Sequence, residues 1–357
     1  MIKGNDLESG NVNKSIAVKR ITALWALSET TLGGILHALH IPITGIFVGG
    51  AAIVFITLIA FFSEQKISII KATVIVLIVK GIVSPYTPIA AYFSVLLQGI
   101  LGQILFSNKK HLPLSAFVLS ITTLLFFGFQ KVIVYTIVFG NTLWQSIDAY
   151  VNFIARQFNI NGQNADSIHF SFILISIYVF IHLAAGIFWG ILAGRIPNWI
   201  TSSINKNEYD LINIKSELEI KYSSTEIKKG NYSKKKRRGI LYLTVAVALI
   251  ILSYLIPGIG ANQAADVALM ILRAIIITLI WYFYIAPLLM HYSKKYLKKH
   301  ENIYAEDVEE IMSLLPHFKN VIRHCWIKSS EHKAFQKYRY FLSYSLLALL
   351  LTNFNFE

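Results

Sequence analysis

Apolar runs of helical length alternate with polar connections along most of this chain. A helix needs about 20 apolar residues to cross the hydrocarbon core of a bilayer, and fewer where neighbouring helices shield it. By this measure the sequence predicts nine spans, at residues 21–39, 45–62, 68–83, 88–106, 113–139, 169–194, 240–256, 267–291 and 339–354. The pattern therefore predicts an all-α protein, a polytopic bundle of transmembrane helices.

Polar segments divide the predicted spans into two groups. After a polar N-terminal tail, residues 1–20, a block of six spans with short loops covers residues 21–195. The Lys/Asn/Ser-rich segment 196–239 is predicted to be a basic cytoplasmic linker. A C-terminal membrane region, residues 240–357, then holds two or three spans around a polar cytoplasmic segment, residues 292–338.

Two polar segments also show helical spacing of their apolar residues. The segment NTLWQSIDAYVNFIARQF, residues 141–158, has one apolar face, which predicts a helix that is either a connector on the membrane surface or a lid over the bundle mouth. The segment IYAEDVEEIMSLL, residues 303–315, begins with acidic residues and predicts an amphipathic cytoplasmic helix.

Composition and charge point the same way. With 55% hydrophobic and 15% charged residues, the chain is more apolar than soluble globular proteins. The net charge of +14 comes mostly from Lys and Arg beside the apolar runs, which is the positive-inside pattern and not a nucleic-acid surface. We therefore expect a multi-pass protein of the cell membrane, of the prokaryotic inner-membrane type, with a cytoplasmic N-terminus. Its surroundings are the lipid bilayer, and no nucleic acid is expected as a partner.

Motifs for nucleotide binding and for common catalytic sites are missing from the sequence. There is no GxxxxGK[ST], no GxSxG, no HExxH and no dinucleotide-binding GxGxxG. The single cysteine excludes an intramolecular disulfide, and its spacing from His317, His324 and His332 matches no standard zinc site. We predict no cofactor, no metal site and no enzymatic activity, so active transport would need an ion gradient or a separate ATPase.

The first predicted span carries ionisable residues that lipid would exclude. In LSETTLGGILHALHIPITG, residues 27–45, Glu29, His37 and His40 share one face that opens toward the predicted outer side. A charge near the bilayer centre costs about 2.5–3.5 kcal/mol, so Glu29 should be paired, protonated or hydrated, and Lys80 lies at comparable depth. Two interpretations stay open: a structural Glu29–Lys80 pair with the histidines at the interface, or a ligand or ion site on this face.

A broken element follows at SPYTP, residues 84–88. Pro85 and Pro88 forbid a continuous helix and free backbone groups that need partners in protein or in a water-filled cavity. Tyr86 lies in this turn, and Gln98 lies in a polar patch of the next span, where interhelical packing is the alternative role. The predicted substrate-binding residues, none of them catalytic, are Glu29, His37, His40, Lys80, Tyr86 and Gln98. If the first face is only structural, the site is expected around Gln98, Gln103 and Gln130.

The order of these motifs resembles a known family. A first helix ending in HIPITG, a second beginning GGAAIVF, and a third ending in SPYTP before a Gln/Gly-bearing fourth are similar to the substrate-binding membrane subunits of energy-coupling factor (ECF) transporters. The resemblance covers residues 21–195. It implies a six-helix bundle with an outward pocket for a vitamin-like solute or metal ion, a transmembrane coupling subunit and two cytoplasmic ATPases. The family's AxxxA motif appears only as the looser stripe Ala26, Thr30 and Gly34.

We therefore expect an integral membrane transport protein, the substrate-binding subunit for uptake of a small solute, energised by a separate partner that docks on the cytoplasmic segments. One alternative is a membrane enzyme or assembly factor acting on a lipid or isoprenoid substrate, with Glu29, His37 and His40 as acid/base residues. Another is a purely structural membrane subunit. A solvated outward pocket would favour transport, whereas a lateral opening between helices would favour lipid chemistry.

Overall fold

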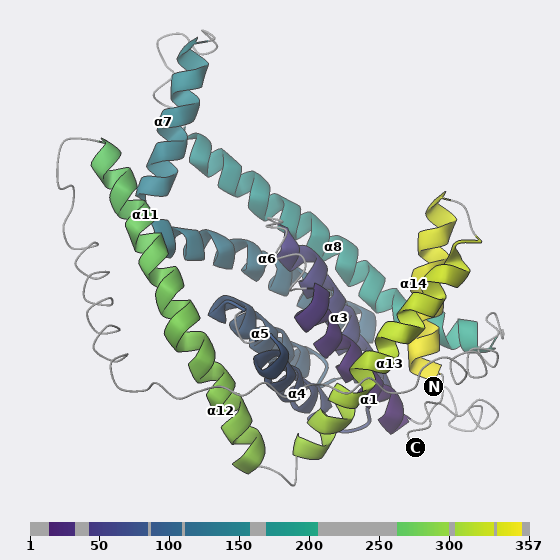
Figure 1. The fold of residues 1–357 in the computed structure, drawn as a ribbon. Coiled ribbons are helices and arrows are strands. Elements are labelled where there is room, and N and C mark those ends of the chain that lie inside the picture. Colours follow the sequence, from purple (N-terminus) through teal and green to yellow (C-terminus); the bar gives the residue numbers. More distant parts are fainter. Residues whose placement is uncertain are drawn as a thin grey trace.

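Helices form all the regular structure in the part of the chain that can be described. The structure is a computed structural model and describes residues 14–32, 43–84, 87–108, 111–157, 169–205, 263–299, 304–331 and 334–351. No strand occurs in these ranges. The protein is an all-α helix bundle, as the apolar pattern predicts (Figure 1).

Four stretches of helix in the described ranges are long and apolar enough to cross a membrane. They are Thr44–Phe62, Leu112–Phe139, Phe170–Ser203 and Ala268–Tyr292. Ile89–Leu105 is a shorter apolar helix. These lengths and compositions are those of an integral membrane protein.

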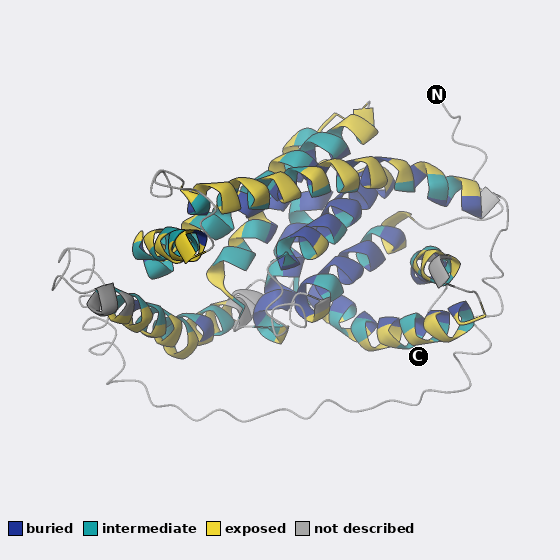
Figure 2. Ribbon diagram, turned by 90° about the horizontal axis from the view of Figure 1, so that it is seen from above, coloured by how far each residue is buried: buried dark blue, intermediate teal, exposed yellow. Residues whose placement is uncertain are grey.

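Six of the described helices build the N-terminal block, in sequence order. These are α1 (Lys14–Leu27), continued by the π-helical turn η1 (Ser28–Leu32), and α3 (Thr44–Phe62), α4 (Ser68–Val83), α5 (Ile89–Leu105), α6 (Leu112–Phe139) and α8 (Phe170–Asn205). Helix α3 contacts α1, α4, α5, α6 and α8, so it lies at the centre of the block. Figure 2 shows the buried residues gathered in these inner helices and the exposed ones on the outer helices.

Two helices extend beyond their predicted spans. Helix α1 begins at Lys14, before the predicted start at residue 21, and buries Arg20, whose Nη1 donates to the Leu350 carbonyl over 2.9 Å. Helix α8 continues to Asn205, past the predicted end at residue 194 and through Pro197. A proline removes one backbone hydrogen bond from a helix, and here the following turn stays buried at Ile200.

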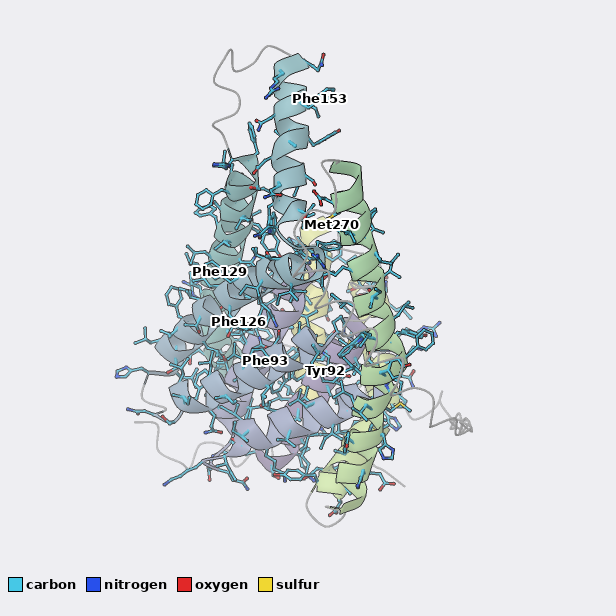
Figure 3. The ribbon with its side chains drawn as sticks, turned by 90° about the vertical axis from the view of Figure 1, so that its left-hand side faces the viewer. Tyr92, Phe93, Phe126, Phe129, Phe153 and Met270 are labelled. Carbon is cyan, nitrogen blue, oxygen red and sulfur yellow. The ribbon has the colours of Figure 1, made fainter. Side chains whose placement is uncertain are left out.

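The segment between α6 and α8 forms α7 (Thr142–Gln157), so the helix predicted at residues 141–158 is confirmed. Only Ala155 of this helix is buried, and Figure 3 shows Phe153 projecting well away from the bundle. Asp148 accepts hydrogen bonds from the backbone N–H and the hydroxyl of Ser171, at 2.6 and 2.9 Å, which caps the start of α8. These contacts favour the connector over the lid.

The C-terminal helices frame the block on two sides (Figure 1). On one side a nearly continuous helix is formed by α11 (Gln263–Ile280), the π-helical turn η4 (Trp281–Ile285) and α12 (Ala286–Lys299). On the other side lie α13 (Glu306–Ser329) and α14 (Ala334–Leu351). The predicted amphipathic helix at residues 303–315 is confirmed and is longer than predicted. The predicted span 240–256 and the linker 196–239, apart from its first ten residues, lie outside the described residues.

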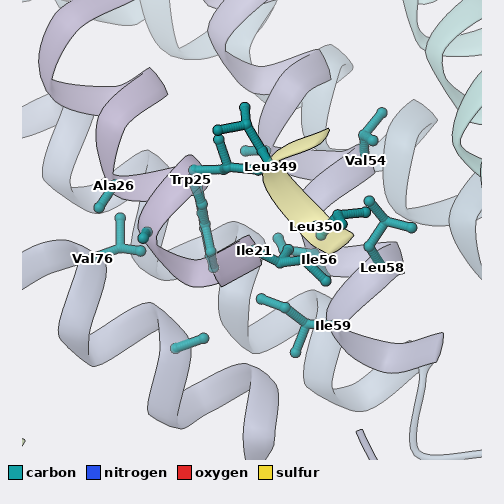
Figure 4. Close-up of a cluster of buried hydrophobic side chains, with 14 of the residues drawn as sticks. Ile21, Trp25, Ala26, Val54, Ile56, Leu58, Ile59, Val76, Leu349 and Leu350 are labelled. Carbon is teal, nitrogen blue, oxygen red and sulfur yellow. The ribbon is translucent and has the colours of Figure 1, made fainter. Parts of the chain in front are cut away.

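The hydrophobic core joins the N-terminal block to α13 and α14. The buried side chains of α13 include Val308, Ile311, Leu314 and Phe318, and they belong to the same cluster as the buried residues of α1, α3 and α4. Figure 4 shows Leu349 of α14 beside Trp25 of α1, and Leu350 of α14 near Ile56 and Leu58 of α3. The two predicted groups of helices therefore share one core.

Ion pairs join the same helices at one end of the bundle. Lys19 of α1 meets Glu310 at 2.5 Å, and Lys71 of α4 meets Asp307 at 2.8 Å. Both acidic residues lie in the first turns of α13. A third pair, Lys14–Glu64 at 2.6 Å, links the start of α1 to the residues after α3. We call these three pairs the junction.

Candidate functional site

A cavity of about 360 Å³ lies at the opposite end of the block from the junction. Its lining comes from η1, from the first turns of α3, from the last turn of α4, from the N-terminal parts of α5 and α8, and from the C-terminal half of α6. Because neighbouring helices run in alternating directions, these parts meet at one end. The volume falls in the range of about 300–1,000 Å³ that small-molecule pockets occupy.

Glu29 and Lys80 form a buried ion pair in the cavity wall. Lys80 Nζ donates to Glu29 Oε2 over 2.6 Å, and the two side chains are 3% and 4% exposed. Glu29 lies in the π-helical turn η1, a helix form that recurs at functional sites. The predicted pairing of Glu29 with Lys80 is confirmed, and it provides each buried charge with the partner that an apolar surrounding requires.

Gln98 also lines the cavity and is 1% exposed. Its Nε2 donates to the Gly49 carbonyl of α3 over 3.1 Å, whereas its Oε1 has no hydrogen-bond partner among the described residues. A buried acceptor without a partner costs about 1–3 kcal/mol. Gln98 therefore joins α5 to α3 and leaves one polar atom unsatisfied in the wall.

Two further side chains in the lining, Lys131 and His182, were not singled out from the sequence. Lys131 of α6 lies with its Nζ 5.8 Å from the centre of the Tyr135 ring. His182 of α8 is 1% exposed, and its Nδ1 bonds to the Tyr178 carbonyl at 2.9 Å. Since a carbonyl only accepts, Nδ1 carries the proton. Both residues could have been found from the sequence, because each is a charged or imidazole side chain within an apolar run. The same feature pointed to Glu29 and Lys80.

Gln130 of α6 was named only as a fallback, and it lines the cavity. Its Oε1 accepts from the Ser94 hydroxyl over 2.8 Å, and its Nε2 donates to the Ala90 carbonyl over 2.9 Å. These two bonds attach α6 to the start of α5. Gln103, the other fallback residue, does not line this cavity and bonds instead to the backbone at Lys66 and Ile70, so it lies apart from Gln98. The reason is that five residues on a helix separate the two side chains in height as well as in direction.

The predicted substrate-binding residues thus divide into two sets. Glu29, Lys80 and Gln98 come together in the wall of one cavity. His37, His40 and Tyr86 lie outside the described residues. Two members of the SPYTP turn, Thr87 and Pro88, do line the cavity, and the turn is braced where the Tyr92 hydroxyl donates to the Ser84 carbonyl over 3.1 Å.

The described residues contain no cluster of three or more His, Cys, Asp or Glu side chains with the proximity that a metal ion requires. Cys325 is fully buried on α13, and burial raises the pKa of its thiol to about 11. A thiol of this kind stays protonated at neutral pH, and it is the thiolate that binds metals. His332 lies outside the described residues.

Comparison of the chain with protein-family models, with curated proteins and with solved structures finds no match. The interpretation of the cavity therefore depends on its own geometry. That geometry combines a buried ion pair, two amides, a second lysine and a histidine with apolar walls, and such a mixture is typical of pockets that orient a small organic molecule.

Proposed function

We propose that this protein is the substrate-binding unit of a membrane uptake system and that a small solute occupies the cavity of about 360 Å³. One observation carries the proposal: polar side chains from several apolar helices converge on the same cavity. Ionisable groups within spans are expensive in lipid, and they generally face a bundle interior or a solute path. The converging residues are Glu29, Lys80, Gln98, Gln130, Lys131 and His182.

The distribution of lysines supports entry of the solute from outside. The junction holds Lys14, Lys19 and Lys71 at the end of the bundle opposite to the cavity. Lys and Arg near the ends of spans favour the cytoplasmic side. We therefore propose a cytoplasmic N-terminus, an outward-facing cavity and a location in the cell membrane of prokaryotic type.

We further propose that a separate partner energises uptake, as the ECF resemblance implies, and that the chain catalyses no reaction itself. A coupling subunit with cytoplasmic ATPases would dock at the junction end, on surfaces of residues 196–239 and 292–338. The apolar face of α13 is already packed against α1 and α4. The partner is thus expected to contact the outer face of α13, where Trp326 and Ile327 are exposed.

We do not adopt the alternative of a lipid-modifying enzyme. That alternative uses Glu29, His37 and His40 as acid/base residues. The Glu29 carboxylate is instead held at 2.6 Å by the Lys80 ammonium group, and the two histidines lie outside the described residues. A purely structural subunit would have little use for a cavity with an unsatisfied amide oxygen in its wall.

Retention of a solute tests the proposal. The protein is purified in native membrane patches, and the small molecules that it releases on denaturation are identified by mass spectrometry. In one variant, Ala91→Phe, a ring on α5 fills the cavity; in its matched control, Leu96→Phe, the ring lies on the exposed side of the same helix. We expect a solute that is retained by the wild type and the control and lost from Ala91→Phe. If no solute depends on the open cavity in this way, the proposal is wrong.

A further inference from the structure

We propose that Gln98 recognises the solute, and that its Oε1 atom accepts a hydrogen bond from an N–H or O–H group on an uncharged part of the solute. This inference rests on the proposed function, because it names the group by which the same cavity selects its solute. Its support is the fixed orientation of the Gln98 amide, the acceptor that this orientation leaves, and the similar arrangement of His182.

The contact with α3 fixes the orientation of the Gln98 amide. The Gly49 carbonyl oxygen lies 3.1 Å from the amide nitrogen, and a carbonyl only accepts hydrogen bonds. The amide NH2 group must therefore face Gly49, and the amide oxygen points away from it. Turning the amide over would bring two oxygens together, so Oε1 is held in place as an acceptor.

This oxygen has no hydrogen-bond partner among the described residues. Gln98 lines the cavity and is 1% exposed, so bulk water does not compensate for the missing hydrogen bond. A buried acceptor without a partner is costly, and a donor group that reaches it removes that cost. Binding energy is therefore available to a solute with an N–H or O–H group, and is not available to a solute of the same shape without one.

A second group in the lining is oriented in the same way. The Nδ1–H group of His182 donates to the Tyr178 carbonyl over 2.9 Å, so Nε2 of the neutral ring carries a lone pair. Gln98 and His182 thus each donate to a backbone carbonyl and present an acceptor on another edge of the same group. Gln130 differs, because both ends of its amide are bonded within the wall. The oriented groups of the lining therefore favour a solute that carries hydrogen-bond donors.

A glutamine in a membrane helix has an ordinary alternative role, which is to join two helices by a hydrogen bond. The contact between Gln98 and Gly49 is sufficient for that role. In that case an ordered water would satisfy the amide oxygen, and solutes with and without a donor group would bind equally well. The two roles differ in a measurable way, because only the proposed one makes the cavity discriminate between solutes of the same shape.

Two probes of nearly identical shape make this measurement. Indole has an N–H group, and benzofuran has an oxygen atom without a hydrogen at the same position. Both are uncharged, and their flat rings suit walls that include Phe127, Tyr135 and Tyr178. Binding to the full chain in phosphatidylcholine nanodiscs is followed by calorimetry, with empty nanodiscs as the background. We expect indole to bind the wild type about 5- to 150-fold more tightly than benzofuran.

Variants assign the effect to Gln98. Gln98→Met keeps the length of the side chain without its amide, so benzofuran should bind as it does to the wild type and the preference for indole should disappear. Gln98→Asn keeps an amide but withdraws its oxygen by one methylene group, and it should also lose most of the preference. Gln103→Met is the matched control, because Gln103 lies on the same helix and does not line the cavity. The control should leave the preference unchanged.

Several outcomes would overturn the inference. They are equal affinity for indole and benzofuran in the wild type, no binding of either probe, and a preference that persists in Gln98→Met. If Gln98→Met binds neither probe, Gln98→Asn decides. Loss of benzofuran binding from both variants would show that Gln98 only supports the wall. Loss of the preference in Gln103→Met would also overturn the inference, because the effect would then follow from the packing of α5.

Failure of this inference and failure of the proposed function can be told apart. The solute-retention experiment with Ala91→Phe does not depend on the donor groups of the solute. If it recovers a solute that has no N–H or O–H group, the proposed function stands and the inference about Gln98 is wrong. If it recovers a solute with such a group, and Gln98→Met binds that solute more weakly, both stand. If it recovers nothing that depends on the cavity, the proposed function is wrong.

Discussion

The two ends of the bundle use the same residue types in opposite ways. At the junction, lysines pair one to one with carboxylates across helices, and their side chains stay partly exposed. At the cavity end, the Glu29–Lys80 pair is almost completely buried, and Lys131 adds a further positive charge to the lining. The junction contains partly exposed ion pairs, whereas the cavity end buries its ion pair and, among the described residues, leaves the Gln98 Oε1 without a hydrogen-bond partner.

The difference shows what burial does to an ion pair. An exposed pair contributes about 0–1 kcal/mol, because water competes for both partners. A buried pair contributes little net stability relative to an apolar pair, yet losing one partner is severe, because the other charge remains in a low dielectric. At the junction, stability should therefore come from the apolar packing beneath the ion pairs. At the cavity end, the stability of the fold should depend on the Glu29–Lys80 ion pair itself.

The largest effect is expected where the buried pair is broken. Glu29→Ala strands the Lys80 ammonium group and should lower the free energy of unfolding by about 3–5 kcal/mol, measured by denaturant titration in detergent micelles. Adding Lys80→Met to Glu29→Ala removes the stranded charge and should recover most of the loss. If the Glu29→Ala protein were as stable as the wild type, the Glu29–Lys80 ion pair would not be needed for the stability of the cavity end.

A slightly smaller effect is expected from the packing below the junction. Leu314 of α13 is 3% exposed in the shared core, so Leu314→Ala should cost about 2–5 kcal/mol in the same titration. Leu279 of α11 is 48% exposed within a candidate span, and Leu279→Ala is the matched control. The control should change stability far less. Equal losses in the two variants would mean that α13 is no more tightly packed than a lipid-facing helix.

The smallest effect is expected from the junction's ion pairs. Lys19→Met should cost about 0–1 kcal/mol. The hydrogen bond to Glu310 raises the pKa of Lys19 above its ordinary 10.5, helped by the charges of Glu310, Asp307 and Glu306 and opposed by partial burial. Because the folded-state pKa is the higher one, the contribution is complete below pH 10.5 and is lost as the pH rises through the folded-state pKa.

The measurement for this pair is the difference in melting temperature between the wild type and Lys19→Met. It should be constant from neutral pH to about 10 and should shrink above that, because deprotonated Lys19 no longer attracts Glu310. Glu310→Gln removes the same interaction from the other side and should give the same profile. A difference that grows with pH would contradict the assigned direction of the pKa shift.

Much of the fold could be predicted from local pattern. Helices α3, α4, α5 and α6 begin and end within one residue of the predicted spans 45–62, 68–83, 88–106 and 113–139. Each of these apolar runs is bounded by polar or turn-forming residues. The start and end of each helix can therefore be predicted from the local sequence. Helix α8 was predicted to end at 194, shortly before Pro197. It continues because the packing of residues such as Ile200 outweighs the lost hydrogen bond.

The candidate site was predictable in part. A carboxylate and a lysine at similar depth in two spans indicate a pair, since lipid penalises each charge alone, and the structure contains that pair. Lys131 and His182 carried the same kind of signal in longer spans. Nothing in their own sequence neighbourhoods relates them to Glu29, because the face that a helix turns toward its neighbours depends on how all the helices pack.

The sequence by itself determined that this is a helical membrane protein, where most of the described helices lie, and that Glu29 and Lys80 belong together. Periodicity and hydropathy are local properties, and they suffice for these conclusions. Only the tertiary structure decided that α13 and α14 share the core of the N-terminal block and that Gln98, Gln130, Lys131 and His182 meet around one cavity. A cavity is the space that side chains from distant segments leave unfilled, so it is set by the packing of the whole bundle and by no single stretch of chain.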